Sequence, residues 1–553
     1  MQFNSNSDFP ASHLPPEQWH TVARQPPEFD PAPFKPCASL TTRVLMRVGD
    51  ESNNIPNLSD LSAVDGQQPA QAIVTVNGHQ YSVVTAKGVL VQTLHGESAA
   101  SGSSMSNNNN SSATNQPLKA HQMSTSSWSD SSDEESSSDD DLMMDSDNNG
   151  VFTTQQESLD SQDRSHISKQ NQQTIERAYW LRGTLRQAIY GHVRYGIILH
   201  KLNPPIRVML PSSNEWTSVE WEATCESVAV KEMSWELLKY QRNRLVEDPI
   251  KEVAAMQYLK RWMEAQEQNQ QAHPASSPVI NGIKSPTPTS FVPPQAMILP
   301  PTNNIHTTSP YLAPQNMLES HIMMPLDLFT DHRNMYSIMP YCSGGELFDA
   351  LERKNRFTEL EARYWMRQIL RGLACLKKAG VAHRDLSLEN LLVHDGNVLV
   401  IDMGMCLRVP MADTSDNIQQ HHQQQQQHQR YLIVPQGVCG KWGYMSPEVC
   451  NNKLPFDGHA VDLWAAGVIL FLMLTGFPPW ERPILSDERF KYMSNGYLVQ
   501  MLTEWNVGLS ADAMDLLQRM FWLDPLDRLS LEQVWSHPWM TATQHSCGDK
   551  LGL

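Results

Sequence analysis

The chain has 553 residues and a formal net charge of −18, from 42 Lys and Arg against 60 Asp and Glu. This acidic balance argues against nucleic acid as the main partner. The eight cysteines include no pair at metal-ligand spacing, as is typical of a reduced, intracellular protein, so we expect a cytoplasmic location and leave the nucleus open. Residues 464–480 form the longest mainly apolar run, but its glycines and Pro-Pro pair favour a buried helix over a membrane span.

The first 172 residues differ in composition from the rest of the chain. They hold 8 Lys and Arg against 21 Asp and Glu. Residues 1–70 are rich in Pro, Ser, Asn and Asp, and residues 96–172 are of low complexity, so we predict that 1–172 is disordered. Within this region, Asn77-Gly78 between alternating apolar residues indicates a hairpin over 72–94. We expect the rest of the chain to fold without residues 1–172.

A globular region is predicted to begin near residue 173. Residues 179–199 predict two strands, and the alternating run Val-Ala-Val-Lys at 228–231 predicts a third. A Pro- and Ser-containing insertion, roughly 202–225, separates the second strand from the third. Residues 250–259 predict a helix that carries Glu252, because apolar residues recur there at helical spacing.

Two further stretches are predicted to be disordered insertions. Residues 265–317 are rich in Gln, Pro, Ser and Asn, and residues 412–430 contain a Gln/His tract. A His-rich tract can bind metal, but the irregular spacing of these residues favours disorder. Between the insertions, residues 336–339 predict a strand and residues 359–379 a helix.

Residues 381–404 hold the densest group of residue types with catalytic chemistry. A His-Arg-Asp-Leu run at 383–386 precedes Asn390, and Asp402 opens an Asp-Met-Gly run. Apolar stretches flank the His-Asp-Gly-Asn sequence at 394–397, which predicts a hairpin that brings Asn390 and Asp402 close together. A carboxylate such as Asp385 can accept a hydroxyl proton, and the oxygens of Asn390 and Asp402 suit magnesium.

These motifs, taken in order, resemble those of eukaryotic protein kinases. Residues 383–390 fit the catalytic-loop pattern H-R-D-L-x-x-x-N, and Asp-Met-Gly stands where kinases carry Asp-Phe-Gly. The resemblance covers about residues 173–541, leaves a short tail over 542–553, and in its Ser-His-Pro-Trp ending is similar to calcium/calmodulin-type kinases. The matching positions are Gly191, Lys231, Glu252, Asp385, Asn390, Asp402, Glu448, Asp462 and Arg528.

The resemblance implies an α+β fold of two lobes, a small mainly β lobe and a large mainly α lobe. It also implies an ATP- and magnesium-dependent enzyme that transfers the γ-phosphate to Ser or Thr hydroxyls of protein substrates. Asp385 would accept the substrate proton, and Lys231 would bind the phosphates with Glu252 as its ion-pair partner. Asn390 and Asp402 would bind magnesium, and Glu448 would pair with Arg528. The residues implied to contact the nucleotide are Gly191, Val193, Ala229, Lys231, Met339, Pro340, Cys342 and Glu346.

Four departures from the kinase pattern stand out. Arg186 and Ala188 replace two of the three glycines of the Gly-rich loop, and Met403 replaces a Phe. Ser387 stands where serine/threonine kinases carry Lys, and Lys441 stands where they carry Thr. We hypothesise that Lys441 reaches across to supply the missing positive charge, which makes it a candidate catalytic residue. The alternative is a solvated loop lysine.

Two functions of other classes remain open at this point. A pseudokinase scaffold, binding partners without turnover, would explain the missing glycines and Ser387. A poly-Gln transcriptional adaptor is weaker, because no basic DNA-binding face is visible. If the chain is an active kinase, the resemblance implies an activation segment over residues 402–448 and a phosphate on it that Arg384 helps to bind. An upstream kinase would then add this phosphate. The candidate acceptors are Thr414, Ser415 and Tyr431.

Overall fold

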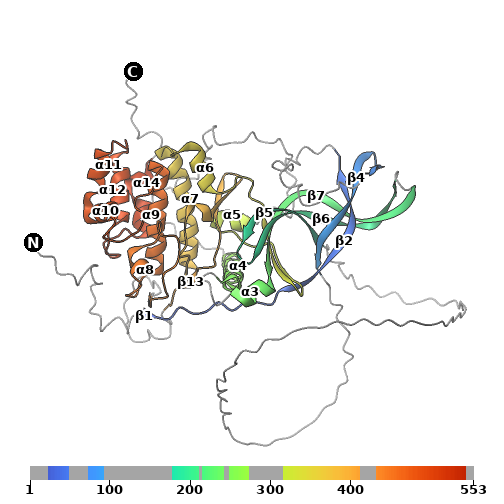
Figure 1. Ribbon diagram of the computed structural model, residues 1–553, viewed down its shortest axis with the longest axis horizontal. Coiled ribbons are helices and arrows are strands. Elements are labelled where there is room, and N and C mark those ends of the chain that lie inside the picture. The colour runs from blue at the N-terminus through green and yellow to red at the C-terminus, as the bar shows by residue number, and fades with distance from the viewer. Residues whose placement is uncertain are drawn as a thin grey trace, which may run out of the picture. The chain divides into compact units, whose positions relative to one another are not determined.

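Strands dominate the described residues up to 234, and helices dominate those after 346 (Figure 1). The computed structural model describes residues 23–48, 72–92, 177–210, 214–241, 248–272, 315–411 and 431–542. The strands are β1 (Ala23–Arg24), β2 (Lys35–Arg47), β3 (Ala72–Val76), β4 (His79–Gln92), β5 (Arg177–Ala188), β6 (Gly191–Leu210), β7 (Glu215–Ser234), β8 (Asp327–Thr330), β9 (Asn334–Pro340), β10 (Val381–Ala382), β11 (Leu391–His394), β12 (Asn397–Val400), β13 (Leu407–Arg408) and β14 (Leu432–Ile433).

Most helices lie in the second half of the chain. They are α3 (Trp235–Gln241), α4 (Pro249–Ala272), α5 (Gln315–Ser320), α6 (Leu347–Lys354), α7 (Glu359–Lys378), α8 (Pro447–Asn451), α9 (Gly458–Thr475), α10 (Glu488–Tyr492), α11 (Leu498–Glu504), α12 (Ala511–Met520), α13 (Leu531–Ser536) and α14 (Pro538–Thr541), with short turns η2 (Leu388–Asn390) and η4 (Met493–Tyr497). The disorder predicted for 1–22, 49–71, 93–172, 273–314 and 412–430, and the tail after 542, lie outside the described residues.

The large sheet is a hydrogen-bonded circuit that closes on itself. Its strand order is β2-β8-β9-β7-β6-β5-β4-β3, and β2 also pairs with β4 and β7. The pairing of β2 with β4 therefore closes the sheet. Strand β3 pairs with β4 and lies outside the closed circuit. Closure satisfies edge N–H and C=O groups that an open sheet would leave exposed.

Residues from the N-terminal region build part of this circuit, so the expectation of disorder is wrong for residues 23–48. Strand β2 contributes Val44 and Leu45 to the buried core, and β4 contributes Val83, Val89 and Leu90. The β3–β4 hairpin turns at Asn77-Gly78, where the sequence indicates a turn. Strand β2 was missed because it pairs with residues up to about 290 positions away, a partnership that no local pattern reveals.

Two more sequence expectations need correction in this half of the chain. Residues 202–225 are not a loose insertion, because most of them extend β6 and β7 into a long hairpin. The stretch 265–317 is not wholly disordered, because α4 continues to Ala272 and α5 begins at Gln315.

Helix α9 lies among α7, α12 and the catalytic segment, and its side chains form the centre of the helical core (Figure 1). It begins after Asp457, whose side chain accepts a hydrogen bond from the N–H of His459, and it ends at Gly476 with φ of 82°. In the described part of the chain, α9 is the one helix long and apolar enough to cross a membrane, yet 83% of that stretch is buried in the protein. This burial agrees with the expectation of a core helix.

Candidate active site

A tight β5–β6 hairpin covers one side of the candidate site. Ala188 pairs with Gly191 across the turn, and Val193 pairs with Lys231 of β7. A Cβ on Gly191 would lie 2.1 Å from the carbonyl oxygen of Glu232, so only glycine fits this close approach. The predicted loop is therefore present in shape, although only this one of its three glycines remains.

The predicted partner of Lys231 is Glu252 on α4. The ammonium nitrogen of Lys231 lies 2.6 Å from Oε2 of Glu252, and their side chains are 14% and 5% exposed. Because both groups are largely desolvated, their attraction is stronger than that of a surface ion pair. The pair therefore links α4 to β7.

Strand β9 carries Met339 and Pro340 and leads to Cys342, three of the residues implied to contact the nucleotide. Ala229 pairs with Met339, and Val228 pairs with Pro340, which ends β9. Cys342 is buried, and burial raises the pKa of its thiol to about 12, so the thiol stays protonated. Val228 and Ala229 of β7 thus lie opposite Pro340 and Met339 of β9, with Cys342 just beyond the end of that strand.

Glu346 has a partner that the sequence analysis missed. Nη1 of Arg186, at the position of an absent glycine, lies 2.5 Å from Oε1 of Glu346. Burial raises the pKa of Glu346, and the charge of Arg186 opposes that rise. The sequence does hold a signal for this pair. Arg186 places a cation where kinases carry glycine, and Glu346 is an acidic residue expected in the same cleft.

The catalytic loop is held by one buried carboxylate. Asp462 of α9 accepts hydrogen bonds from the backbone N–H groups of His383 and Arg384, both at 2.7 Å. Arg384 and Asp402 adopt left-handed backbone conformations, with φ of 68° and 66°. Such conformations cost free energy in non-glycine residues and persist only where surrounding contacts impose them.

Asp385 and Asn390 are joined directly. Nδ2 of Asn390 donates to the backbone carbonyl of Asp385 at 2.7 Å and to its Oδ2 at 3.0 Å. Burial raises the pKa of Asp385, while the nearby charges of His383 and Lys441 oppose the rise. The result is a carboxylate with a raised proton affinity, as a general base requires.

The predicted hairpin is present and brings the magnesium candidates together. Strands β11 and β12 pair from Leu391↔Val400 to His394↔Asn397, and the turn residues Asp395 and Gly396 both have positive φ. The backbone N–H of Ile401 then donates to the carbonyl of Asn390 at 3.0 Å. This turn chemistry explains why the sequence predicts the hairpin correctly.

The donor set at this point fits magnesium. Because the amide nitrogen of Asn390 is engaged by Asp385, its carbonyl oxygen is the atom directed elsewhere. Asp402 adds a half-buried carboxylate and raises the proton affinity of Asp385 through its charge. One amide oxygen and one carboxylate leave room for phosphate and water ligands, the arrangement that Mg²⁺ prefers.

Lys441 reaches the catalytic loop. Its ammonium nitrogen donates to Oγ of Ser387 at 2.6 Å and lies 3.3 Å from Oε2 of Glu389. The preceding residue, Gly440, has φ of 89° and passes so close that a Cβ would lie 3.2 Å from Oδ1 of Asp385. This close approach delivers Lys441 to the buried Ser387. The contact with Glu389 was not predicted.

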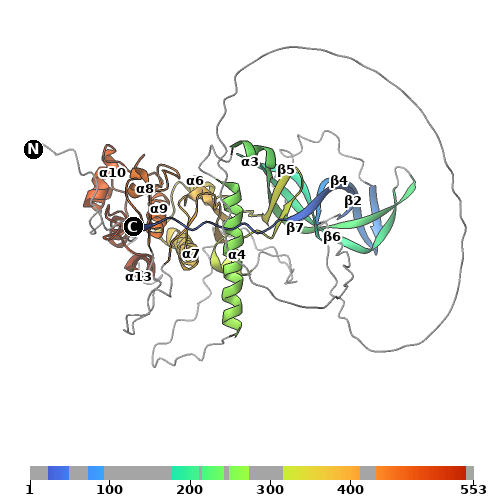
Figure 2. The same cartoon turned by 90° about the horizontal axis from the view of Figure 1, so that it is seen from below.

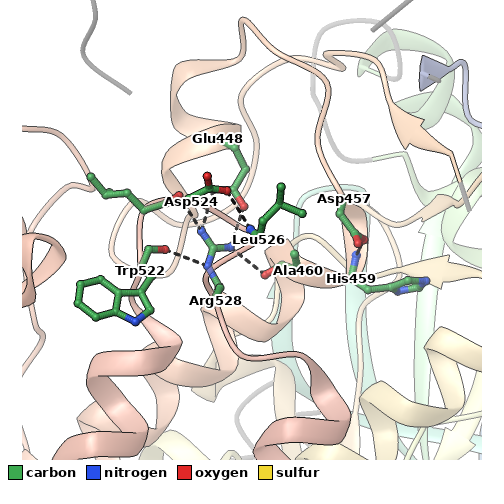
Figure 3. A network of polar contacts seen from close by, with 9 residues as sticks. Glu448, Asp457, His459, Ala460, Trp522, Asp524, Leu526 and Arg528 are labelled. Atoms are coloured by element: carbon green, nitrogen blue, oxygen red, sulfur yellow. Dashed lines mark hydrogen bonds and ion pairs between the residues drawn. The ribbon is translucent and has the colours of Figure 1, made fainter. Parts of the chain in front are cut away.

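The predicted pair of Glu448 and Arg528 ties the end of the activation segment to the helical core. Figure 3 shows the guanidinium of Arg528 facing the carboxylate of Glu448. Its Nη1 and Nη2 donate to Oε1 and Oε2 of Glu448 at 2.8 and 3.3 Å. Arg528 also donates to the carbonyls of Trp522 and Ala460, and it lies 4.7 Å from the ring centre of Trp464. Its side chain is 1% exposed, so this charge depends on these partners.

The buried guanidinium of Arg384 also contacts the activation segment. Its guanidinium donates to the carbonyls of Met405 and Gly437, at 3.5 and 3.3 Å. Lys251 of α4 is close enough for its charge to interact with Arg384, and burial lowers the pKa of Lys251. Of the predicted acceptors, Thr414 and Ser415 lie outside the described residues, and Tyr431 opens the next described stretch.

Comparison with known proteins agrees with this arrangement. The model of the protein kinase domain family matches residues 305–540. Residues 305–540 form a protein kinase domain. The expected resemblance to protein kinases is thereby confirmed for this part of the chain, and the match implies the two-lobed fold that the family shares.

Several curated kinases are similar to the same part of the chain. Maternal embryonic leucine zipper kinase of Xenopus tropicalis is 31% identical over 229 residues, which cover 41% of this chain and 31% of that protein. Serine/threonine-protein kinase DCLK3 of Mus musculus is 31% identical over 234 residues, which cover 42% of this chain and 27% of that protein. Calcium/calmodulin-dependent protein kinase cmkB of Emericella nidulans is 30% identical over 233 residues, which cover 41% of this chain and 52% of that protein. The match thus spans about half or less of each relative.

The matched kinase domain begins after five of the predicted site residues, which are Gly191, Val193, Ala229, Lys231 and Glu252. They precede residue 305, yet the sheet and the ion pair on α4 join them to the domain. The structure thus supports the link that the resemblance implies across the insertion between α4 and the matched stretch.

Proposed function

We propose that this chain transfers the γ-phosphate of ATP to Ser or Thr hydroxyls of protein substrates. The observation that carries the proposal is the joint assembly of Lys231 with Glu252 and of Asp385 with Asn390. The first pair can hold phosphate charge, and the second positions a carboxylate to accept a hydroxyl proton. Both pairs are largely buried, so the groups are fixed before any substrate arrives.

The proposal extends the kinase domain to about residues 173–541, beyond the matched stretch. Its support is that β5, β6, β7 and α4 supply the nucleotide-side residues. Gly191, Val193, Ala229, Met339, Pro340 and Cys342 would surround the nucleotide. Met403 supports an ordered cleft, because it is buried in the same apolar cluster as Met256 of α4.

Magnesium would be held by the side-chain oxygens of Asn390 and Asp402. When bound, it would neutralise phosphate charge during transfer. Asp385 would orient the acceptor hydroxyl and receive its proton, and Lys231 would orient the phosphates. Lys441 would place positive charge beside the transferring group, with Ser387 and Glu389 fixing its position.

The preference for Ser or Thr rests on the catalytic-loop sequence, which lacks the pattern of tyrosine kinases, and on the names of the similar proteins. Regulation by an upstream kinase and a cytoplasmic location stay predictions. Arg384 supports such regulation in principle, because it contacts the activation segment at both of its described sides.

A pseudokinase scaffold is the second candidate. The observation that favours it is the ion pair of Arg186 and Glu346, which places a side chain across a cleft that glycine leaves open in active kinases. Such a protein would bind partners, and nucleotide binding would not lead to turnover.

One experiment separates the two functions. Purified full-length chain is incubated with radiolabelled ATP, magnesium and a generic Ser/Thr substrate, beside Asp385→Ala protein. The proposal expects incorporation that depends on Asp385. No incorporation by the wild-type chain, with nucleotide binding intact, would favour the scaffold.

A further inference from the structure

A proline-rich segment near the N-terminus runs along three parts of the molecule that contain site residues. This segment, residues 24–35, passes from β14 across α4 to the start of β2, and Figure 2 shows its dark trace crossing α4. We call it the strap. Its prolines restrict φ and remove N–H donors, so an extended path costs less conformational entropy than in most sequences.

At its first end, the strap contacts the activation segment. Strand β1 pairs in parallel with β14, and the backbone N–H of Val434 donates to the carbonyl of Arg24 at 3.2 Å. The guanidinium of Arg24 lies 4.7 Å from the ring centre of Tyr431. Nε2 of Gln436 donates to Oε1 of Gln25 at 3.1 Å. These contacts set the path of residues 431–436.

In its middle, the strap holds α4. The side-chain amide of Gln257 accepts from the N–H of Ala32 at 2.7 Å and donates to its carbonyl at 3.2 Å. The rings of Phe29 and Tyr258 meet edge to face at 5.6 Å between centres. The hydroxyl of Tyr258 also donates to the carbonyl of Ala379 at 2.9 Å, which connects the helix to the catalytic-loop side.

At its last end, the strap joins the sheet. The rings of Phe34 and Trp235 lie 6.3 Å apart, and the ammonium of Lys35 lies 3.0 Å from Oδ1 of Asp327. Lys35 then starts the pairing of β2 with β8. The strap is therefore anchored at both ends and fastened to α4 between them.

This geometry bears on Glu252. At about 100° per residue, Gln257 and Tyr258 point roughly 120–140° away from Glu252 around the α4 axis, one on either side. Lys231 thus contacts one face of α4 through Glu252, while the strap contacts the opposite faces through Gln257 and Tyr258. We propose that the strap is a positioning segment that keeps α4 where Glu252 meets Lys231, and that couples this position to the activation segment. The inference rests on the proposed kinase function.

The test uses the full-length chain with Gln257→Leu, which removes both hydrogen bonds to Ala32 at similar size. Gln266→Leu, an exposed glutamine further along α4, is the matched control. We expect Gln257→Leu to lower kcat/KM for ATP by about tenfold, as the loss of two hydrogen bonds implies, and Gln266→Leu to leave it unchanged. Phe29→Ala should act like Gln257→Leu, and Phe29→Tyr should restore the wild-type value.

A double variant distinguishes positioning from general support of the fold. In a Glu252→Gln background, Gln257→Leu should have little further effect on kcat/KM, because the group it positions is already neutral. An equal loss in both backgrounds, or an equal loss in the Gln266→Leu control, would overturn the proposal.

Hydrogen exchange gives a readout that does not need turnover. Amides of residues 250–262 should exchange faster in Gln257→Leu than in the wild-type chain, while those of α9 should not change. A wild-type chain without kinase activity would contradict the proposed function. Unchanged exchange of the α4 amides in Gln257→Leu would instead refute the role proposed for the strap.

Discussion

The ammonium of Lys441 lies 2.6 Å from the hydroxyl oxygen of Ser387. In serine/threonine kinases a lysine and a threonine stand at these two positions in the opposite order, so the charge and the hydroxyl have exchanged places. Ser387 is buried and Lys441 is only partly exposed. The solvated-lysine alternative does not agree with this contact, although the catalytic role of Lys441 stays a proposal.

This exchange predicts a non-additive pair of variants. Lys441→Thr should lower kcat by roughly 100-fold, the usual loss when one preorganised charge donor is removed. Ser387→Lys alone should also lower kcat, because it crowds two ammonium groups. The double variant should recover much of the activity in steady-state assays. Lys453→Thr, an exposed lysine in the same half of the domain, is the control. Near-normal turnover by Lys441→Thr would end the hypothesis.

Asp385→Ala should remove turnover by about 100-fold to 10,000-fold, while leaving the affinity for ATP close to wild type. The carboxylate is expected to orient the acceptor and not the nucleotide. Since burial raises the pKa of Asp385, the acid limb of the kcat/KM profile should lie above the pH at which an exposed aspartate titrates, about 4. Rate measurements across pH, with a fluorescent nucleotide for binding, check both parts. An Asp385→Ala enzyme as fast as wild type would contradict the kinase proposal.

Glu448→Ala should lower the free energy of unfolding by about 3–5 kcal/mol, because it leaves the buried guanidinium of Arg528 without its charged partner. Chemical denaturation followed by circular dichroism measures the change. The control is Glu532→Ala, which breaks a surface pair with Lys377 and should cost about 1 kcal/mol or less. Equal losses in the two variants would mean that burial of Arg528 does not matter.

Asp462 should contribute a distinctive pH dependence to stability. Burial raises its pKa from the ordinary 3.8 to about 6, so the folded chain binds more protons than the unfolded chain between these values. Its stabilising contribution is therefore fully present below about pH 4 and is lost as the pH rises through about 6. The free energy of unfolding of wild type minus that of Asp462→Asn should fall by at most about 1.4 kcal/mol per pH unit in this window. A difference that stays flat or rises would refute the prediction.

Leu45→Ala should lower the free energy of unfolding by about 2–5 kcal/mol, because the side chain is 1% exposed and its removal leaves a cavity in the closed sheet. The control is Val48→Ala, because Val48 directly follows β2 and is well exposed. It should change the free energy of unfolding by no more than about 0.5 kcal/mol. If Leu45→Ala is as stable as Val48→Ala, strand β2 does not belong to the cooperative core.

The sequence by itself determined the features that depend on short-range chemistry. The turn at Asp395-Gly396 predicts the hairpin that joins Asn390 to Asp402, because few residues other than these accept positive φ at adjacent positions. The resemblance to kinases extends this to pairs that are distant in the chain. It placed Lys231 with Glu252 and Glu448 with Arg528, and the structure has both ion pairs.

Only the tertiary structure decided which distant segments meet. Strand β2 and the strap looked like a polar, proline-rich tail, since their partners on β4, β7 and α4 supply the burial that their own composition lacks. The contact of Arg186 with Glu346 was hidden for the same reason. Local propensity describes what a segment can form alone, whereas burial and charge pairing depend on neighbours that the chain brings together only when it folds.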